Sequence, residues 1–390
     1  MTKPSFLVPS IASSEFATMF VAFELSKASW QIGFVLPGSQ TTSRFVIDGG
    51  DTASVSALLR RKRLEAEKRC GRPVRIVSCY EAGYDGFWLH RWLDEQGVIN
   101  HVLDAASIEV DRRKRRVKTD RIDLDKLMRT LLALYRGEPQ VCRVVRVPSP
   151  AEEDDKRRHR ERDRLIKERG AHVNRIKALL HGQGIRDVKP LAKNFERQLN
   201  KLRTGDGRPL AALLMAEIGR ELLRLRPLVQ QIAQLESETA AAMRSAAAGS
   251  TVAKAAQLHR LMAIGMTGAQ VLAHEVYYRS FANRRQVGSY IGLTGTPYDS
   301  GAKQREQGIS KAGNRRARTM LIELAWLWAR HQPDSALSRW FRQRLGETKS
   351  RRMRKVLIVA LARRLAIALW RYLETGLVPD GARLRTAPAI

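Results

Sequence analysis

The sequence predicts mixed α/β structure followed by all-helical structure, and three observations lead to this prediction. Short apolar runs rich in β-forming residues fill the first third of the chain, highly charged helical patterns fill the middle, and strongly apolar helical runs fill the last third. A chain of 390 residues has room for two or three domains with sizeable cores. We place the predicted domains at residues 17–147, 151–247 and 255–375.

The first predicted domain has the element order of an RNase H-like fold. Three β-rich runs come first, at residues 18–25, 30–36 and 44–47. Helical and strand-like patterns then alternate at residues 53–69, 74–79, 87–96, 99–103 and 120–135. A three-stranded meander followed by helix, strand, helix, strand and helix is the order of the RNase H-like, or RuvC-like, class.

The middle domain is predicted to be a pair of helices. Nearly every residue from Glu152 to Arg169 is charged, and a sparse apolar seam follows as far as Leu180. A second helical pattern runs from Glu217 to Ser245, and a polar insert at residues 182–209 separates the two. The seam favours an antiparallel helical hairpin or coiled coil. For the first charged turns, a solvated helix without a partner explains the pattern equally well.

The third domain is predicted to be helical. Met320–Arg330 and Val356–Leu373 are strongly apolar at helical spacing, and we expect them to form its core. Leu261–Gly268 joins two further helical runs. A turn between paired helices can bind phosphate through its backbone N–H groups, although Met266 interrupts the usual glycine spacing of such turns.

The net charge of +31 points to a polyanionic partner, and nucleic acid fits best. A membrane surface is the competing partner, but no apolar run approaches the ~20 residues of a spanning helix, and no signal peptide is evident. The three cysteines, Cys70, Cys79 and Cys142, form no CxxC pair, which argues against a zinc site or a disulfide framework. We therefore expect a cytoplasmic, nucleoid-associated protein.

The segment Pro297–Asn314 is the most informative for chemistry. Its content of Gly, Ser and Gln is too high for a core element, so we expect a glycine-supported loop in which Ser300 directly precedes Gly301. Cations that flank a small hydroxyl can lower its pKa and neutralise charge on a phosphorus centre, as a nucleophile attacking a phosphodiester requires. A basic surface loop with an incidental serine is the alternative. The cations are Lys303, Arg305, Lys311, Arg315 and Arg316.

Four acidic residues of the first domain form a second candidate site. Glu24 ends the first predicted strand and Glu81 follows the strand at residues 74–79. Asp120 and Asp123 are three residues apart at the start of a predicted helix, so they share one face. In an RNase H-like sheet these positions converge, and clustered carboxylates favour a bound cation such as Mg²⁺, often as a pair of ions, in phosphoryl transfer. Each acid alone could equally be a surface or helix-cap residue.

A dense run of cations precedes Asp120 in the chain. Such a run beside an acidic pocket suits a phosphate backbone that is led across a metal site, and a solvated basic loop is the alternative. The run consists of Arg112, Arg113, Lys114, Arg115, Arg116 and Lys118.

These motifs together resemble the DEDD transposases of the insertion-sequence one-ten family. The likeness runs from about Phe20 to about Leu373. Its motifs are Tyr80-Glu-Ala-Gly83, Lys118-Thr-Asp-Arg-Ile-Asp123, Tyr290-Ile-Gly-Leu293, Asp299-Ser-Gly301, Gly308-Ile-Ser-Lys-Ala-Gly-Asn314 and Ala317-Arg-Thr-Met-Leu321.

The resemblance implies a serine recombinase guided by a structured (bridge) RNA. It implies a RuvC-like domain with Mg²⁺ held by an Asp–Glu–Asp–Asp set, a coiled coil for multimerisation, and a C-terminal transposase domain carrying a catalytic serine. Glu81, Asp120, Asp123 and Ser300 match that pattern. The partners implied are target and donor DNA, the guide RNA, and further copies of the chain in a dimer or tetramer.

One position departs from the family pattern. The first acid is Glu24, within Phe23-Glu-Leu-Ser-Lys27, where the family usually has Asp. Glutamate keeps the charge but adds a methylene. Both a metal site with shifted geometry and a weakened metal site are compatible with this change. Glu24 keeps one rival function open, an inactive nucleic-acid-binding protein descended from a transposase. A metal-dependent junction nuclease without serine chemistry, in which Ser300 is structural, is a separate rival.

Overall fold

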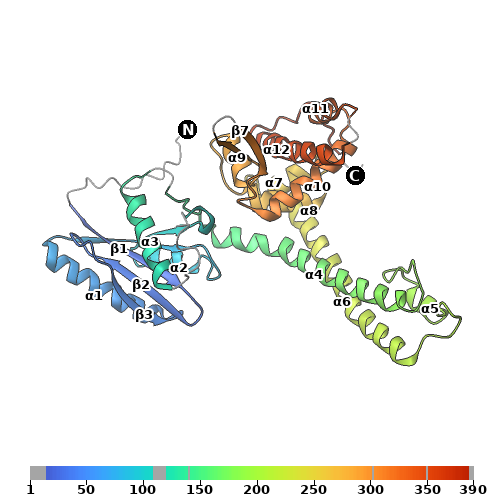
Figure 1. Ribbon diagram of the computed structural model, residues 1–390, viewed down its shortest axis with the longest axis horizontal. Helices are drawn as coiled ribbons and strands as arrows, with labels where there is room; N and C mark the ends of the chain where they lie inside the picture. The colour runs from blue at the N-terminus through green and yellow to red at the C-terminus, as the bar shows by residue number, and fades with distance from the viewer. Residues whose placement is uncertain (1–14, 109–119, 139–140, 301–302, 348–349, 386–390) are drawn as a thin grey trace. The chain divides into compact units, whose positions relative to one another are not determined.

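The structure, a computed structural model, describes residues 15–108, 120–138, 141–300, 303–347 and 350–385 (Figure 1). The chain divides into two compact units, Met1–Ser149 and Pro150–Ile390. Among the described residues, no helix has the length and apolar character needed to cross a bilayer.

The first unit is built on a five-stranded mixed sheet. Its strand order is β3-β2-β1-β4-β5. The first three strands pair antiparallel, whereas β1 pairs with β4, and β4 with β5, in parallel. The strands are β1 (Ala17–Leu25), β2 (Ser29–Val35), β3 (Ser43–Asp48), β4 (Val74–Glu81) and β5 (Ile99–Leu103).

Helices cover both faces of this sheet, as the alternation of apolar side chains along its strands requires. On one face, Phe23 and Trp30 pack with α1 (Thr52–Cys70) and α2 (Trp88–Glu95). On the other face, Ala22 and Cys79 pack with α3 (Asp120–Tyr135). The sequence predicted the five strands and the three α-helices described in this unit but missed the short 3-10 helix η1 (Ala105–Ser107). Its main boundary error is at β4, which continues through Glu81 instead of ending at Cys79.

Helix α3 runs antiparallel to β1. Near its start, Leu124 packs beside Gly33, whose partner in the sheet is Ala22. At its end, the rings of Tyr135 and Phe20 meet edge to face with centroids 5.0 Å apart. The first turn of α3 is therefore at the end of the sheet where β1 and β4 finish.

The second unit begins with two long helices, α4 (Pro150–His181) and α6 (Ala212–Arg244). They lie side by side (Figure 1), and short α5 (Phe195–Leu199) lies in the insert between them. The helices are antiparallel, because the residue numbers of their ion-pair partners rise along α4 while they fall along α6. These pairs are Arg162–Glu236 at 2.5 Å, His172–Glu221 at 2.6 Å and Arg175–Glu217 at 2.6 Å. The predicted helical hairpin is therefore present, and we call it the arm.

The rest of this unit is a helical bundle with one small sheet. Its centre is the C-terminal helix, whose residues Leu361, Leu365 and Leu369 are fully buried among the other helices. Tyr277 donates a buried hydrogen bond of 2.8 Å to the carbonyl of Ala366 on this helix. The helices are α7 (Thr251–His259), α8 (Met266–Leu272), the π-helical turn η3 (Ala273–Tyr277), α9 (Arg284–Tyr290), α10 (Arg315–His331), α11 (Ala336–Leu345) and α12 (Arg351–Thr375).

The segment predicted to be a loop around Ser300 is instead a β-hairpin. Strand β6 (Gly295–Ser300) pairs antiparallel with β7 (Lys303–Ile309). Low intrinsic strand propensity is overridden here because the two strands satisfy each other's backbone groups across a short connection. Pairing of Ser300 with Lys303 puts the serine at the tip.

Candidate active site

Two of the predicted acids come together at the edge of the sheet. Phe23 pairs with Tyr80 in the parallel ladder, so the next residues, Glu24 and Glu81, are neighbours at the ends of β1 and β4. Side chains in register on adjacent strands point to one face. By the alternation that puts Ala22 against α3, that face is the one covered by α3. Glu81 is exposed and Glu24 is half-buried.

Helix α3 brings Asp123 to the same end of the sheet. Asp123 is half-buried and directly precedes Leu124, which is fully buried against the sheet. Asp120 is the first residue of the helix, one turn earlier, and its side chain lies outside the described residues. Within the described part of the chain, no three His, Cys, Asp or Glu side chains are close enough to hold a metal ion. The four-acid Mg²⁺ site therefore stays a prediction, supported so far by the convergence of β1, β4 and α3.

The basic run before α3 lies outside the described residues. All six of its cations, from Arg112 to Lys118, fall within residues 109–119. Asp125 of α3, by contrast, forms a 2.6 Å ion pair with Arg44 of β3.

The candidate nucleophile is on the hairpin of the second unit. Backbone pairing places Ser300 opposite Lys303, with residues 301–302 between them outside the described chain. The side chains of Ser300, Lys303 and Arg305 are likewise not described. The other predicted cations have definite positions: Lys311 and Arg315 are exposed, whereas Arg316 forms a 2.9 Å ion pair with Asp163 of α4.

The base of the hairpin is packed closely against the end of α9. Gly313 has φ of +97° and Gly292 has φ of +69°. Residues other than glycine rarely adopt these backbone conformations. A Cβ on Gly313 would be 2.2 Å from the Tyr290 carbonyl oxygen, and one on Gly292 would be 2.0 Å from that of Ala312. Only glycine at both positions permits this approach.

Backbone hydrogen bonds hold the same two segments together. The N–H groups of Ser310, Lys311 and Asn314 donate to the carbonyls of Thr294, Gly292 and Tyr290 at 2.8, 3.2 and 3.0 Å, respectively. We call residues 310–314 the hairpin base.

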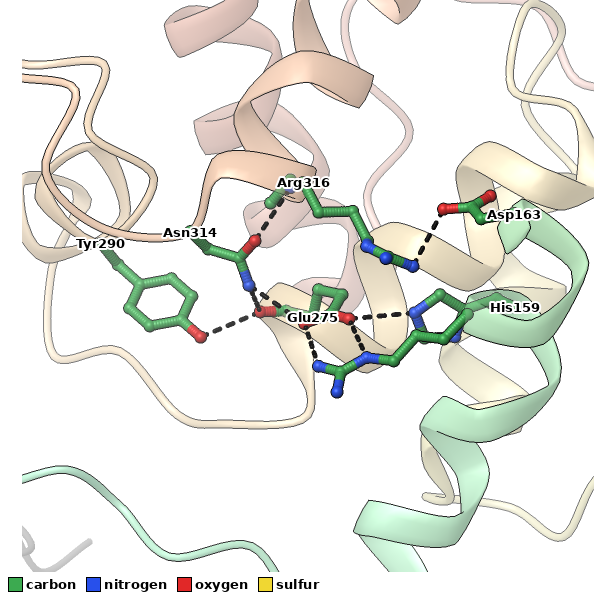
Figure 2. Close-up of polar contacts among 8 residues, drawn as sticks. His159, Asp163, Glu275, Tyr290, Asn314 and Arg316 are labelled. Atoms are coloured by element: carbon green, nitrogen blue, oxygen red, sulfur yellow. Dashed lines mark hydrogen bonds and ion pairs between the residues drawn. The ribbon is translucent and has the colours of Figure 1, made fainter. Parts of the chain in front are cut away.

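A buried carboxylate, Glu275, connects this base to the arm (Figure 2). Four hydrogen bonds reach its two oxygens. Oε1 accepts from His159 Nε2 at 3.0 Å and from Arg160 Nε at 2.9 Å, and Oε2 accepts from Arg160 Nη2 at 3.2 Å and from Asn314 Nδ2 at 3.1 Å. The Glu275 carbonyl also accepts from the Tyr290 hydroxyl at 3.0 Å. One residue of η3 thus binds α4, α9 and the hairpin base together.

Asn314 has a second role in this network. It is the N-cap of α10, where its Oδ1 accepts a 3.0 Å hydrogen bond from the N–H of Ala317 while its amide nitrogen faces Glu275 (Figure 2). The orientation of Asn314 therefore joins the start of α10 to the buried carboxylate.

The electrostatics of this network keep Glu275 ionised. Burial alone would raise its pKa, but the hydrogen bonds from His159 and Arg160, the charge of Arg160 and the Asn314 amide together hold the pKa of Glu275 well below its ordinary range. The pKa of its neighbour His274 is lowered as well, but here burial is the main cause. Burial, followed by the nearby His159 and Lys156, lowers the pKa of His274 to about 4. The His274 ring stacks on that of His159 with centroids 5.8 Å apart.

The sequence prediction missed this network entirely. One signal was available: His274 and Glu275 interrupt the apolar run Val271–Tyr277, and a charged residue inside such a run requires buried partners. The partners themselves could not be read from the sequence, because His159 is 116 residues away from Glu275.

Known proteins match this chain over the hairpin and beyond it. Residues 255–340 match the family described as "Transposase IS116/IS110/IS902 family". The chain is 46% identical over 385 residues to "Putative transposase y4rJ" of Sinorhizobium fredii, covering 97% of each protein. The chain belongs to the IS116/IS110/IS902 transposase family.

A more distant relative agrees with this assignment. The chain is 29% identical over 216 residues to "Transposase for insertion sequence element IS1111A" of Coxiella burnetii, covering 54% of the chain and 55% of that protein. The family match at residues 255–340 includes Ser300, Glu275, Tyr290 and Asn314 of this transposase, whereas the four acids of the first unit precede it.

Proposed function

We propose that this transposase cuts and rejoins DNA with Ser300 as the nucleophile. Family membership supports DNA as the substrate. The observation that carries the role of Ser300 is the hairpin, because its strand pairing places this residue beside the short connection at the tip. Exposed Lys311 and Arg315 at the other end of the hairpin suit a phosphate backbone.

In the proposed reaction, the Ser300 oxygen attacks the phosphorus of one strand. The Ser300 hydroxyl gives up its proton as its oxygen bonds to phosphorus, the bond between phosphorus and one sugar oxygen breaks, and the freed sugar oxygen takes up a proton in exchange. Attack by another strand's hydroxyl reverses these steps and releases the serine. Neighbouring cations would stabilise the charge that develops on the phosphoryl oxygens.

We further propose an RNase H-like first unit whose acidic edge holds Mg²⁺. The strand order, with three antiparallel strands and two added in parallel, supports this fold. Carboxylate oxygens are suitable ligands, and Glu24, Glu81, Asp120 and Asp123 would hold the ion. When bound, Mg²⁺ would neutralise charge on a phosphate oxygen. Glu24 would reach it through one more methylene than Asp.

A structured guide RNA and further copies of the chain complete the proposal. A net charge of +31 exceeds what one short duplex needs and suits a folded RNA bound together with target and donor DNA. The arm, a long antiparallel helical pair, suits coiled-coil contacts between protomers in a dimer or tetramer.

Ser300→Ala tests the central claim. We expect recombination to be lost while DNA binding is retained, because a small side chain at the tip of a hairpin contributes little to stability. Denaturing gels should show a protease-sensitive protein–DNA adduct with the wild-type protein and none with the variant. Cleavage by the variant without an adduct would favour the junction nuclease, and loss of activity on RNase treatment would separately support the guide RNA.

A further inference from the structure

We propose that Glu275 is a positioning residue that holds the hairpin base against helix α4, so that the arm and the Ser300 hairpin move as one body. This inference rests on the proposed role of Ser300. It assigns a role to a buried residue that contacts no reacting group.

Glu275 is ionised and fully enclosed. Its side chain is 5% exposed, and each of its oxygens accepts two hydrogen bonds. A buried charge is tolerated only when such partners are in place, so any displacement of α4 or of Asn314 leaves it partly unpaired. The positions of α4, η3 and the hairpin base relative to one another are consequently restricted.

The segments that Glu275 joins have different roles. His159 and Arg160 belong to α4 of the arm, which would respond to another protomer or to nucleic acid. Asn314 belongs to the hairpin base. Arg316 and Asp163 add a second link, at 2.9 Å, between α10 and the same stretch of α4 (Figure 2).

Glu275 itself lies in a π-helical turn, η3. Such turns are rare and are frequently found at functional sites. Here the turn places His274 beside His159 and Glu275 between the arm and the hairpin base.

The path from Glu275 to Ser300 runs through the hairpin base and the two strands. Asn314 ends the hairpin base, whose N–H groups bind the 290–294 segment. At Gly292 and Gly313 the base approaches the end of α9 too closely for a Cβ to fit between them. Strands β6 and β7 continue directly from these two segments to the tip. A shift of the base would therefore displace Ser300, and a displacement of ~1 Å can lower a rate on the order of a hundredfold.

The test compares Glu275→Gln with Glu221→Gln in the full-length protein. Glu221 is a matched control, because this carboxylate, with 12% of its side chain exposed, also binds a histidine and an arginine, His172 at 2.6 Å and Arg224 at 2.7 Å. Its contacts join α4 to α6 and do not involve the hairpin. Amide hydrogen exchange of residues 310–314 reports on the hairpin base, and recombination per bound DNA reports on the reaction.

We expect Glu275→Gln to speed exchange of the hairpin base about ten- to a hundredfold, the usual effect of losing hydrogen bonds to a charged group. Recombination should slow on the order of a hundredfold with unchanged DNA affinity. Glu221→Gln should leave both readouts near wild type. The double variant Glu275→Gln/Asn314→Asp, which exchanges carboxylate and amide while keeping an N-cap residue, should recover part of both losses.

Should Glu275→Gln not fold, Asn314→Ser serves instead, because it retains an N-cap oxygen and removes only the amide that binds Glu275. The inference is overturned if exchange of the hairpin base is no faster than in Glu221→Gln, or if it is faster while recombination per bound DNA is unchanged. Exchange does not depend on chemistry at Ser300. An active Ser300→Ala protein with accelerated exchange in Glu275→Gln would refute the serine mechanism alone.

Discussion

The acidic edge of the first unit and the buried carboxylate of the second use the same functional group in opposite ways. Glu81 is exposed at the end of a strand, whereas Glu275 is buried and its oxygens are occupied by protein donors. An exposed carboxylate at a converging edge can take a cation from solvent, but an enclosed one can only fix the groups around it. This difference in exposure is why we propose Glu81 as a metal ligand and Glu275 as a positioning residue.

The largest effect is expected at the acidic edge of the first unit. Asp123→Asn should lower the rate of recombination by about a hundredfold or more. The reason is that loss of one ligand disturbs both the charge and the geometry around a bound ion. Asp125→Asn, two residues along α3, removes only the ion pair with Arg44 and should have little effect. Recombination assays across a Mg²⁺ series would measure both. Equal activity of the two variants would remove the acidic edge from the site.

The next effect concerns the hairpin base. Gly313→Ala should destabilise the second unit by about 3 kcal/mol, because the residue combines a positive φ with a backbone clash. Gly308→Ala is the matched control, since Gly308 in the same hairpin has φ of +91° and open space around its Cβ position. It should lose only about 1 kcal/mol. Denaturant unfolding would measure both, and similar losses would show that the close approach to Tyr290 is not a constraint.

The smallest expected effect is a dependence of the free energy of unfolding on pH through His274. The folded protein holds the pKa of His274 at about 4 against an ordinary 6.5, so the unfolded chain takes up the proton first as the pH falls. This contribution to stability is present above pH 6.5 and is lost as the pH falls towards 4. Between pH 7 and pH 5 it should remove about 2 kcal/mol.

The pH measurement needs a variant to isolate this residue. Denaturant unfolding of wild type and His274→Gln at the two pH values gives the required difference, because other titrating groups are common to both. The stability of the variant should depend less on pH by that amount. Parallel stability profiles would mean that His274 does not titrate differently in the folded state.

The sequence by itself determined the elements of the first unit and the positions of its candidate acids. Strand and helix periodicities predicted the strands and α-helices described between residues 17 and 135, because each depends on a local repeat of apolar residues. Placing Glu24 and Glu81 at adjacent strand ends required only the element order, since parallel neighbours finish at the same edge. The helical arm was predicted for the same reason.

The tertiary structure alone decided the surroundings of Ser300. The Gly, Ser and Gln content of Pro297–Asn314 predicted a loop, and only cross-strand pairing made the segment from Gly295 to Ile309 a hairpin. Glu275 reads locally as an odd charge in an apolar helix, and its partners are separated from it by 116 residues to His159 and 39 to Asn314. Local patterns carry no information about such pairings, because their energy arises only when burial removes the charge from water and brings its partners within hydrogen-bonding distance.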